Sequence, residues 1–148
     1  MTLATIEEAI VYHLLDDIQI QEMVDDKVYL IALPQSITLP AITYQRISTD
    51  RLMTHDQDAG GLATARIQFD TYATTYAEAK KTASALRNSL LGYKGQMGGV
   101  NTVRVDATLS ALEQDSMEPD LKIYRITTDY LISYEEGDWD DYYPDLSP

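Results

Sequence analysis

The sequence has 148 residues, no cysteine, and 24 Asp and Glu against 11 Lys and Arg, which gives a formal net charge of −13. This length suits one domain with a core of its own, and the lack of cysteine excludes disulfides and a cysteine nucleophile. No cluster of Lys and Arg is present to neutralise a phosphate backbone, so direct binding to nucleic acid is also excluded.

The acidic charge gathers at the C-terminal end. Six acids and no Lys or Arg lie in the last 14 residues, so residues 1–134 carry a net charge of only −7. An acidic surface repels nucleic acid, which suits a protein past which DNA slides and equally a protein that imitates DNA. A surface that merely confers solubility is the third interpretation.

The N-terminal segment MTLATIEEAIVYHLL lacks the basic leader and the small-residue cleavage site of a signal peptide. No apolar run approaches the roughly 20 residues that a membrane-spanning helix needs. The sequence therefore predicts a soluble protein that is made in a cytoplasm and has no membrane partner.

The first predicted element is a helix over about residues 6–16. Thr5 and Glu8 form a capping box at its start, and the apolar side chains that follow recur on one helical face. Residues 18–26 are ambiguous, and no element is assigned to them.

Two strands are predicted next, an apolar run at 28–33 and the segment 41–48, with a proline-bracketed connector between them. A loop of about 13 residues follows at 49–61. Loops of this length inside a compact domain are usually functional or disordered.

The middle of the chain predicts a strand and then a helix. Residues 63–72 alternate between apolar and polar side chains, as in a strand with one wet side. Thr75 and Glu78 form a second capping box, and the helix that it begins is expected to reach Leu91. Its inner stripe is expected to consist of Ala79, Ala83, Leu86 and Leu90.

The last third predicts a glycine-rich turn at 92–99 and two strands, 100–109 and 121–134, which the loop EQDSMEPD joins into a hairpin. The alternation predicts one inner face on the earlier of these strands. Its members are Val103, Val105, Ala107 and Leu109.

Together these elements predict an α+β domain in the order α-β-β-β-α-β-β, with a mostly antiparallel sheet and two helices packed on one of its faces. The domain is expected to span residues 1–136. Residues 137–148 form an acidic, aromatic tail with too few aliphatic side chains to pack alone.

The sequence offers no catalytic constellation. His13 lies in the first predicted helix, where a packed or exposed histidine is far commoner than a base. His55 lies beside Asp56 and Asp58 in the long loop, but a third firm metal ligand is missing. The glycines of 92–99 follow a helix rather than a strand, which does not fit a phosphate-binding loop. We therefore expect no enzymatic activity, no metal and no cofactor.

The predicted domain does not account for three segments, which are the 49–61 loop, the 92–99 turn and the tail. The loop places apolar side chains next to an arginine, and the tail separates large rings by acids, as contacts with a protein partner require. The simple alternatives are that the loop side chains fold back on the core and that the tail is free in solvent. The candidate interface residues are Arg51, Leu52, Met53, Gln96, Met97, Trp139, Tyr142 and Tyr143.

The run ARIQFDTYATTYAEAKKTASALRNSLLG at 65–92 resembles the central strand-then-helix signature of the tail-completion, or tail-terminator, proteins of long-tailed, siphovirus-like bacteriophages. The helix TIEEAIVYHLL, the strand LPAITYQRIS and the closing strand YRITTDYLISY occur in the family's order. The resemblance covers most of residues 3–134 and rests on strand, helix and apolar spacing rather than on an invariant motif. The length of the 49–61 loop and the acidic tail lie outside it.

The resemblance implies a small α+β domain that forms a homohexameric ring on the head-proximal end of the tail tube. Such a ring ends tube polymerisation, contacts the major tail tube protein, and offers a docking surface to the head–tail connector protein. It implies no activity and no cofactor, and DNA passes through the lumen without specific binding. The protein is then expected in the tail or neck of the virion, after assembly in the host cytoplasm.

Three other functions stay open at this point. The protein could be another neck component or minor tail protein with the same type of fold. It could be an acidic inhibitor that mimics DNA, although the acids concentrate in the tail and the strands carry interspersed Arg and Lys. It could also be a small hydrolase that uses His55 with Asp56 and Asp58.

Overall fold

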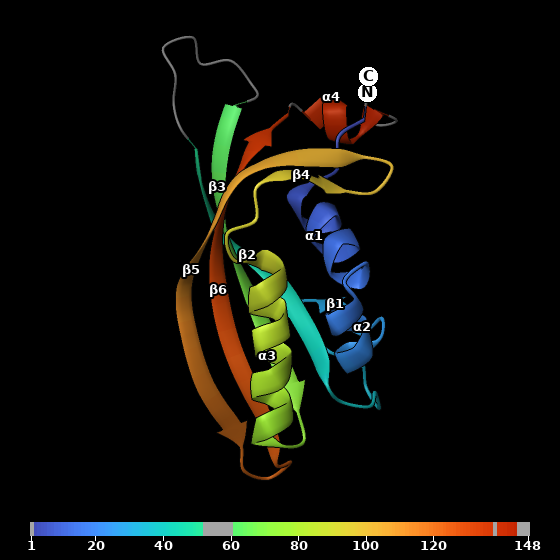
Figure 1. Ribbon diagram of the computed structural model, residues 1–148, viewed down its shortest axis with the longest axis vertical. Helices are drawn as coiled ribbons and strands as arrows, with labels where there is room; N and C mark the ends of the chain where they lie inside the picture. The colour runs from blue at the N-terminus through green and yellow to red at the C-terminus, as the bar shows by residue number, and fades with distance from the viewer. Residues whose placement is uncertain (1, 52–60, 138, 145–148) are drawn as a thin grey trace.

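The computed structural model describes residues 2–51, 61–137 and 139–144, and Figure 1 shows the arrangement of their helices and strands. No helix among these residues is both long and apolar enough to cross a membrane. The helices are α1 (Ile6–Leu15), α2 (Ile18–Val24), α3 (Tyr76–Leu90) and α4 (Trp139–Tyr142). The strands are β1 (Val28–Leu30), β2 (Ala41–Arg51), β3 (Gly61–Ala73), β4 (Gly95–Gly98), β5 (Thr102–Glu118) and β6 (Ile123–Glu136).

The strands form one curled sheet in the order β1-β2-β3-β6-β5-β4. β1 runs parallel to β2, and the other neighbouring strands are antiparallel. Helices α1, α2 and α3 lie on one side of the sheet, which we call the inner face (Figure 1). The start of β5 bends over with β4 and brings β4 into contact with α1. No helix among the described residues covers the opposite side, which we call the outer face.

The core fills the space between the inner face and the three helices. Leu86 and Leu90 of α3 are completely buried in it, together with apolar residues of α1, α2 and the four central strands. Phe69 and Tyr130 meet edge to face, with ring centroids 5.8 Å apart. Burial raises the pKa of Tyr130 to about 12, so its hydroxyl stays protonated at every physiological pH.

Thr5 and Thr75 cap α1 and α3, as predicted. The backbone N–H groups of Glu8 and Glu78 donate to the side-chain oxygens of Thr5 and Thr75, each over 3.2 Å. Gly92 takes a left-handed φ of 78° directly after Leu91, the C-cap residue of α3. The predicted inner stripe of α3 is confirmed as buried at Ala79, Ala83, Leu86 and Leu90.

Three short elements, α2, β4 and α4, lie where the sequence predicts none, so the expected order of helices and strands is wrong. α2 occupies residues without a clear period, and it begins at Asp17, whose carboxylate accepts from the N–H groups of Gln19 and Ile20. β4 lies inside the predicted turn at 92–99. Its terminal glycines, Gly95 and Gly98, have φ values of 131° and 127°, which suit the curl of the chain at this edge.

Three strands differ from prediction in extent. β1 ends at Leu30 because Ile31 takes a left-handed φ of 68°. β2 continues to Arg51, so the start of the predicted 49–61 loop is strand. The largest difference is in β5, which runs through most of the predicted loop 113–120 before the chain turns into β6.

A bulge overturns the predicted inner face of β5. The register with β6 shifts between Val105 and Ala107, and an extra residue reverses the alternation beyond it. Val103, Val105 and Thr108 are therefore buried on the inner face. Ala107 and Leu109 turn to the outer face instead, where Leu109 is 60% exposed.

Two aspartates lie buried on the outer face of the sheet, Asp129 at 2% exposure and Asp70 at 7%. The Nε of Arg66 donates to Asp129 over 2.7 Å. Arg125 donates to Asp70 over 2.9 and 3.2 Å, and the hydroxyl of Thr127 donates to the same carboxylate. These cross-strand pairs neutralise carboxylates that would otherwise be buried as single charges.

Arg66→Met is expected to lower the free energy of unfolding by about 2–3 kcal/mol, because it leaves the Asp129 carboxylate buried without its cation. Urea unfolding followed by circular dichroism measures the loss. Arg104→Met is the matched control, since Arg104 pairs with the half-exposed Asp106 over 3.4 Å and should contribute less than about 0.5 kcal/mol. Equal losses in the two variants would contradict this role of Arg66.

Candidate assembly surfaces

The described residues contain no group of metal-ligating side chains that could hold an ion. The ring of His13 packs edge-on against Tyr93, with centroids 4.7 Å apart, and its Nε2 donates to the carbonyl oxygen of Ser89 over 3.0 Å. His13 therefore joins α1 to the end of α3 as a packing residue. The predicted cluster around His55 lies outside the described residues.

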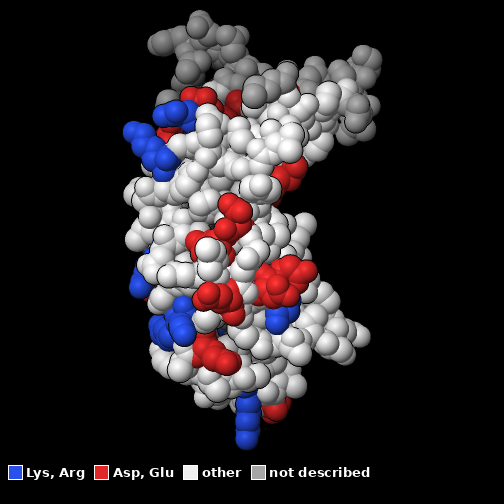
Figure 2. Space-filling view, turned by 45° about the vertical axis from the view of Figure 1, so that its right-hand side comes forward, with Lys and Arg blue, Asp and Glu red and all other residues white. Residues whose placement is uncertain are grey.

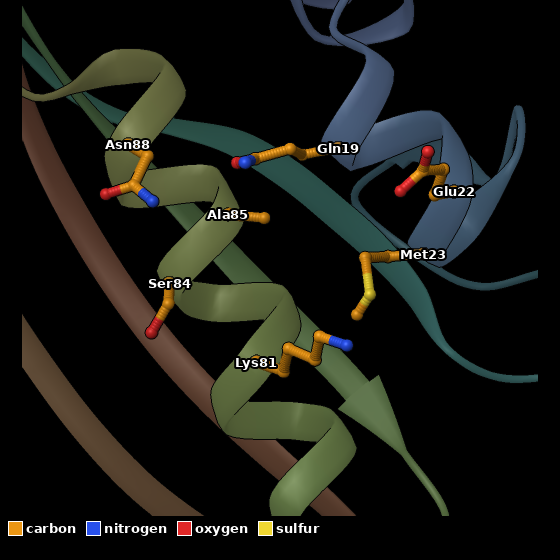
Figure 3. Close-up of a pocket in the computed structure, with 7 residues that line it drawn as sticks. All are labelled: Gln19, Glu22, Met23, Lys81, Ser84, Ala85 and Asn88. Carbon is orange, nitrogen blue, oxygen red and sulfur yellow. The ribbon is translucent and has the colours of Figure 1, made fainter.

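A cleft of about 500 Å³ separates α2 from α3 (Figure 3). Ser84 and Lys81 lie on the same helix but point in different directions in Figure 3, so the serine has no lysine base beside it. Met23 and Ala85 form the apolar part of the cleft. Its lining thus offers polar and apolar contacts without a nucleophile–base pair.

A chain of polar contacts ties α1, β2 and β6 together at one end of the sheet. Arg46 of β2 forms an ion pair with Glu7 of α1 and donates to the hydroxyl of Tyr134 over 3.2 Å. Arg51 donates to both carboxylate oxygens of Glu136, over 2.6 and 2.8 Å. The hydrogen bonds from Arg51 lower the pKa of Glu136, whereas burial raises the pKa of Tyr134. These contacts link the end of β2 to the end of β6 across β3, which lies between them in the sheet.

The described part of the predicted tail folds back on the chain. The backbone N–H of Leu3 donates to the carbonyl oxygen of Asp141 over 2.8 Å, and that of Gly137 donates to the hydroxyl of Tyr142 over 2.6 Å. The ring of Tyr143 lies 6.3 Å from that of Tyr142 and stays 48% exposed. α4 is thus attached to the N-terminal segment, beside the start of α1 (Figure 1).

A groove of about 590 Å³ lies between α1 and the edge formed by β1 and β2. Its apolar side chains include Tyr12, Leu30 and Tyr143, which are 52%, 58% and 48% exposed. Glu7 and Glu8 add acidic groups to the rim. Exposed rings and aliphatic side chains beside charged groups are the composition of a protein-binding surface. The groove is lined by Thr5, Glu7, Glu8, Val11, Tyr12, Leu15, Leu30, Tyr44 and Tyr143.

The predicted interface residues are distributed over different environments. Arg51 and Tyr143 lie on the surface as described above, and Gln96 is an exposed residue of β4. Met97 is only 1% exposed and belongs to the core, so the surface of the single subunit does not include it. Leu52 and Met53 lie outside the described residues, as does the side chain of Trp139.

Sequence reasoning missed the groove because its lining comes from several segments of the chain. One signal was available in α1. Val11, Tyr12 and Leu15 lie between the buried positions of this helix, so α1 carries apolar side chains around most of its circumference. A helix with that pattern has contacts on more than one side.

Over the residues that the structure describes, the surface of the folded domain carries both acidic and basic groups and no large area of one sign. In Figure 2 acidic groups gather along the middle of the visible face, and Lys and Arg form separate groups beside them. Several acids of the sheet and of α1 are already ion-paired within the chain, including those that contact Arg46, Arg51, Arg66, Lys80 and Arg125. The described surface therefore resembles neither a basic nucleic-acid site nor a row of free phosphate-like charges.

The model of the family described as "Tail completion protein gp17" matches residues 8–135. The chain belongs to this family, and it is accordingly a structural protein of a bacteriophage tail.

The fold also occurs in a solved structure whose title is "Virion of native gene transfer agent (GTA) particle". The two chains share 17% sequence identity at a TM-score of 0.69, and the match covers 86% of this chain and 93% of that chain. At this identity the similarity shows the fold alone. A search of curated proteins gives no match.

Arg51→Gln is expected to raise the pKa of the Glu136 carboxyl toward its ordinary value of 4.5. Because the pKa is lowered in the folded state, the pair contributes stability above the ordinary glutamate pKa and loses it as the pH falls through the lowered value. An NMR titration of the Glu136 side-chain carboxyl measures the change. Arg104→Gln is the control and should leave this pKa unaltered; an unaltered pKa in the Arg51 variant would refute the pairing.

Proposed function

We propose that this protein caps the head-proximal end of the phage tail tube as a homohexameric ring, ends polymerisation of the tube, and joins the tail to the head. The family match over residues 8–135 is the observation that carries the proposal. In this role the protein contacts the major tail tube protein on one side and the head–tail connector protein on the other. It acts by binding, without a catalytic step or a cofactor.

The distribution of charge supports this role. DNA that leaves the head must pass through the ring without being retained, and a net charge of −13 disfavours contact with its phosphates. The ion pairs on the body of the chain argue against a DNA-mimic inhibitor, which needs unpaired carboxylates over a folded face. The second candidate is another neck component with the same fold, to which the family match applies as well.

Deletion of the gene from its phage is expected to give tails of uncontrolled length that are separate from filled heads. Negative-stain electron microscopy of the lysate measures both features, and complementation from a plasmid serves as the control. Tails of normal length that stay separate from heads would contradict termination and favour another neck role. Intact virions would contradict the proposal as a whole.

Leu52→Asp and Met53→Asp are expected to abolish attachment to tail tubes while the chain still folds, because a charge at an apolar protein contact is costly. Sedimentation of purified variants with tail tubes measures attachment, and circular dichroism tests folding. Gln57→Asp is the matched control in the same loop, since it adds the same charge without removing an apolar side chain. Normal attachment of both apolar variants would remove this loop from the interface.

A further inference from the structure

The second half of β5 is an unpaired sheet edge. β4 pairs with β5 only as far as Val105, and the backbone N–H of Gly92 reaches Thr108. Beyond that point every residue from Leu109 to Glu118 is exposed, and no backbone partner on the outer edge of this segment is present among the described residues. The backbone N–H and C=O groups of this segment that point away from β6 are a template for another strand.

The opposite end of the sheet has a second free edge. β1 covers only the start of β2, up to Tyr44. From Gln45 to Arg51 the outer edge of β2 has no strand beside it within the described part of the chain. Ile47 in this segment is 45% exposed at a bulge. One sheet therefore ends in two open edges, one on β2 and one on β5.

We propose that the free edge of β5, Leu109–Glu118, pairs with the free edge of β2, Gln45–Arg51, in a second copy of this chain. This contact joins different surfaces of the two copies, so it can repeat from one copy to the next, head to tail. The repeat closes into a ring when the rotation between neighbouring copies is a whole fraction of a full turn. The inference deepens the proposed function by naming the surfaces that form the subunit interface.

The strand directions fit this contact. β2, β3, β6 and β5 are adjacent and antiparallel in turn, so β2 and β5 run in opposite directions. A rotation about an axis that runs roughly along the strands keeps those directions. β5 of one copy then meets β2 of the next copy antiparallel, which continues the pattern within each subunit.

Charge supports a second copy as the occupant. The β5 edge carries Glu113, Asp115 and Glu118 and no cation, whereas the β2 edge carries Arg46 and Arg51 with a single acid. Two β5 edges would bring like charges together, which is destabilising across a strand pair. A β5 edge on a β2 edge avoids this repulsion, because Arg46 and Arg51 are already neutralised by Glu7 and Glu136, and Asp115 by Lys80.

One register places the inner-face residues of β5 beside inner-face residues of β2, and the outer-face residues beside each other. Gln114 and Ser48 lie in the middle of the two segments, and both point to the outer face. When they are paired, the bulge at Ile47 puts Asp115 level with Arg46 on the inner face. The pairing ends at Ser116 and Gln45, because β1 already occupies the edge of β2 at Tyr44. A slip by one residue would reverse every face.

This register also requires a stagger. Within one subunit Ser48 is level with Leu109, through Arg66 of β3 and Leu131 of β6. Leu109 and Gln114 pair with Leu131 and Thr127 of β6, so pairing Ser48 with Gln114 of the neighbour shifts each subunit by about four residues along the strands, roughly 14 Å. A repeated shift of one sense is the shear by which a sheet closes into a barrel of tilted strands.

Cysteine cross-linking tests the pairing. The sequence has no cysteine, so no other disulfide can form. The double variant Gln114→Cys/Ser48→Cys is oxidised both as the purified full-length chain at increasing concentration and in isolated tails. Directly opposed residues of two strands lie within disulfide reach. Non-reducing electrophoresis should show a ladder of covalent multimers that ends at the ring size, and each single variant should remain monomeric.

The register control is Gln114→Cys/Thr49→Cys, which places the two thiols on opposite faces and should not cross-link. Dimers from Gln114→Cys alone would overturn the proposal in favour of a pairing of two β5 edges. A double variant without multimers, in the purified chain and in tails alike, would show that charge protects these edges instead of joining them.

The outcomes separate this inference from the proposed function. A protein found at the tail end without cross-links would refute only the strand pairing. Cross-linked multimers of the purified chain, with the protein located elsewhere in the particle, would refute only the capping function.

Discussion

The structure depends on how two carboxylates are neutralised on a sheet face that no described helix covers. Asp129 and Asp70 are buried there, and Arg66 and Arg125 reach them from neighbouring strands. Because each pair joins β3 to β6, the central strands are held in register from the outer side while the apolar core holds them from the inner side. The outer face can then remain polar and open without a second layer of helices.

Helices cover one face of the sheet and the other face is polar. The strand edges are therefore the surfaces that remain for assembly with other subunits. Bulges in β2 and β5 curl the sheet and turn Leu109 outward, and the two open edges end up on opposite sides of the subunit. The groove beside α1 lies along one of these edges and adds apolar surface to it. A tail completion protein that forms a ring needs two different surfaces on each subunit, and the open edges of β2 and β5 are the pair that we propose for this contact.

Much of the fold follows from the sequence where a pattern repeats several times. The capping boxes at Thr5 and Thr75 and the alternation through β3 and β6 set those elements without reference to the rest of the chain. α2 and β4 escape prediction because each is too short for a period to show. The length of β5 also escapes it, since its second half is exposed on both faces and has no apolar alternation to read. The burial of Met97 depends on the curl that lays β4 over α1, which no local pattern encodes.

Cryo-electron microscopy of tails at the point where they meet the head tests the central claim most directly. The account predicts a ring of identical subunits between the tube and the connector, in which this fold fits the density and sheets of neighbouring subunits meet edge to edge. Density for this fold at another position in the particle, or a particle that lacks the protein, would contradict the account.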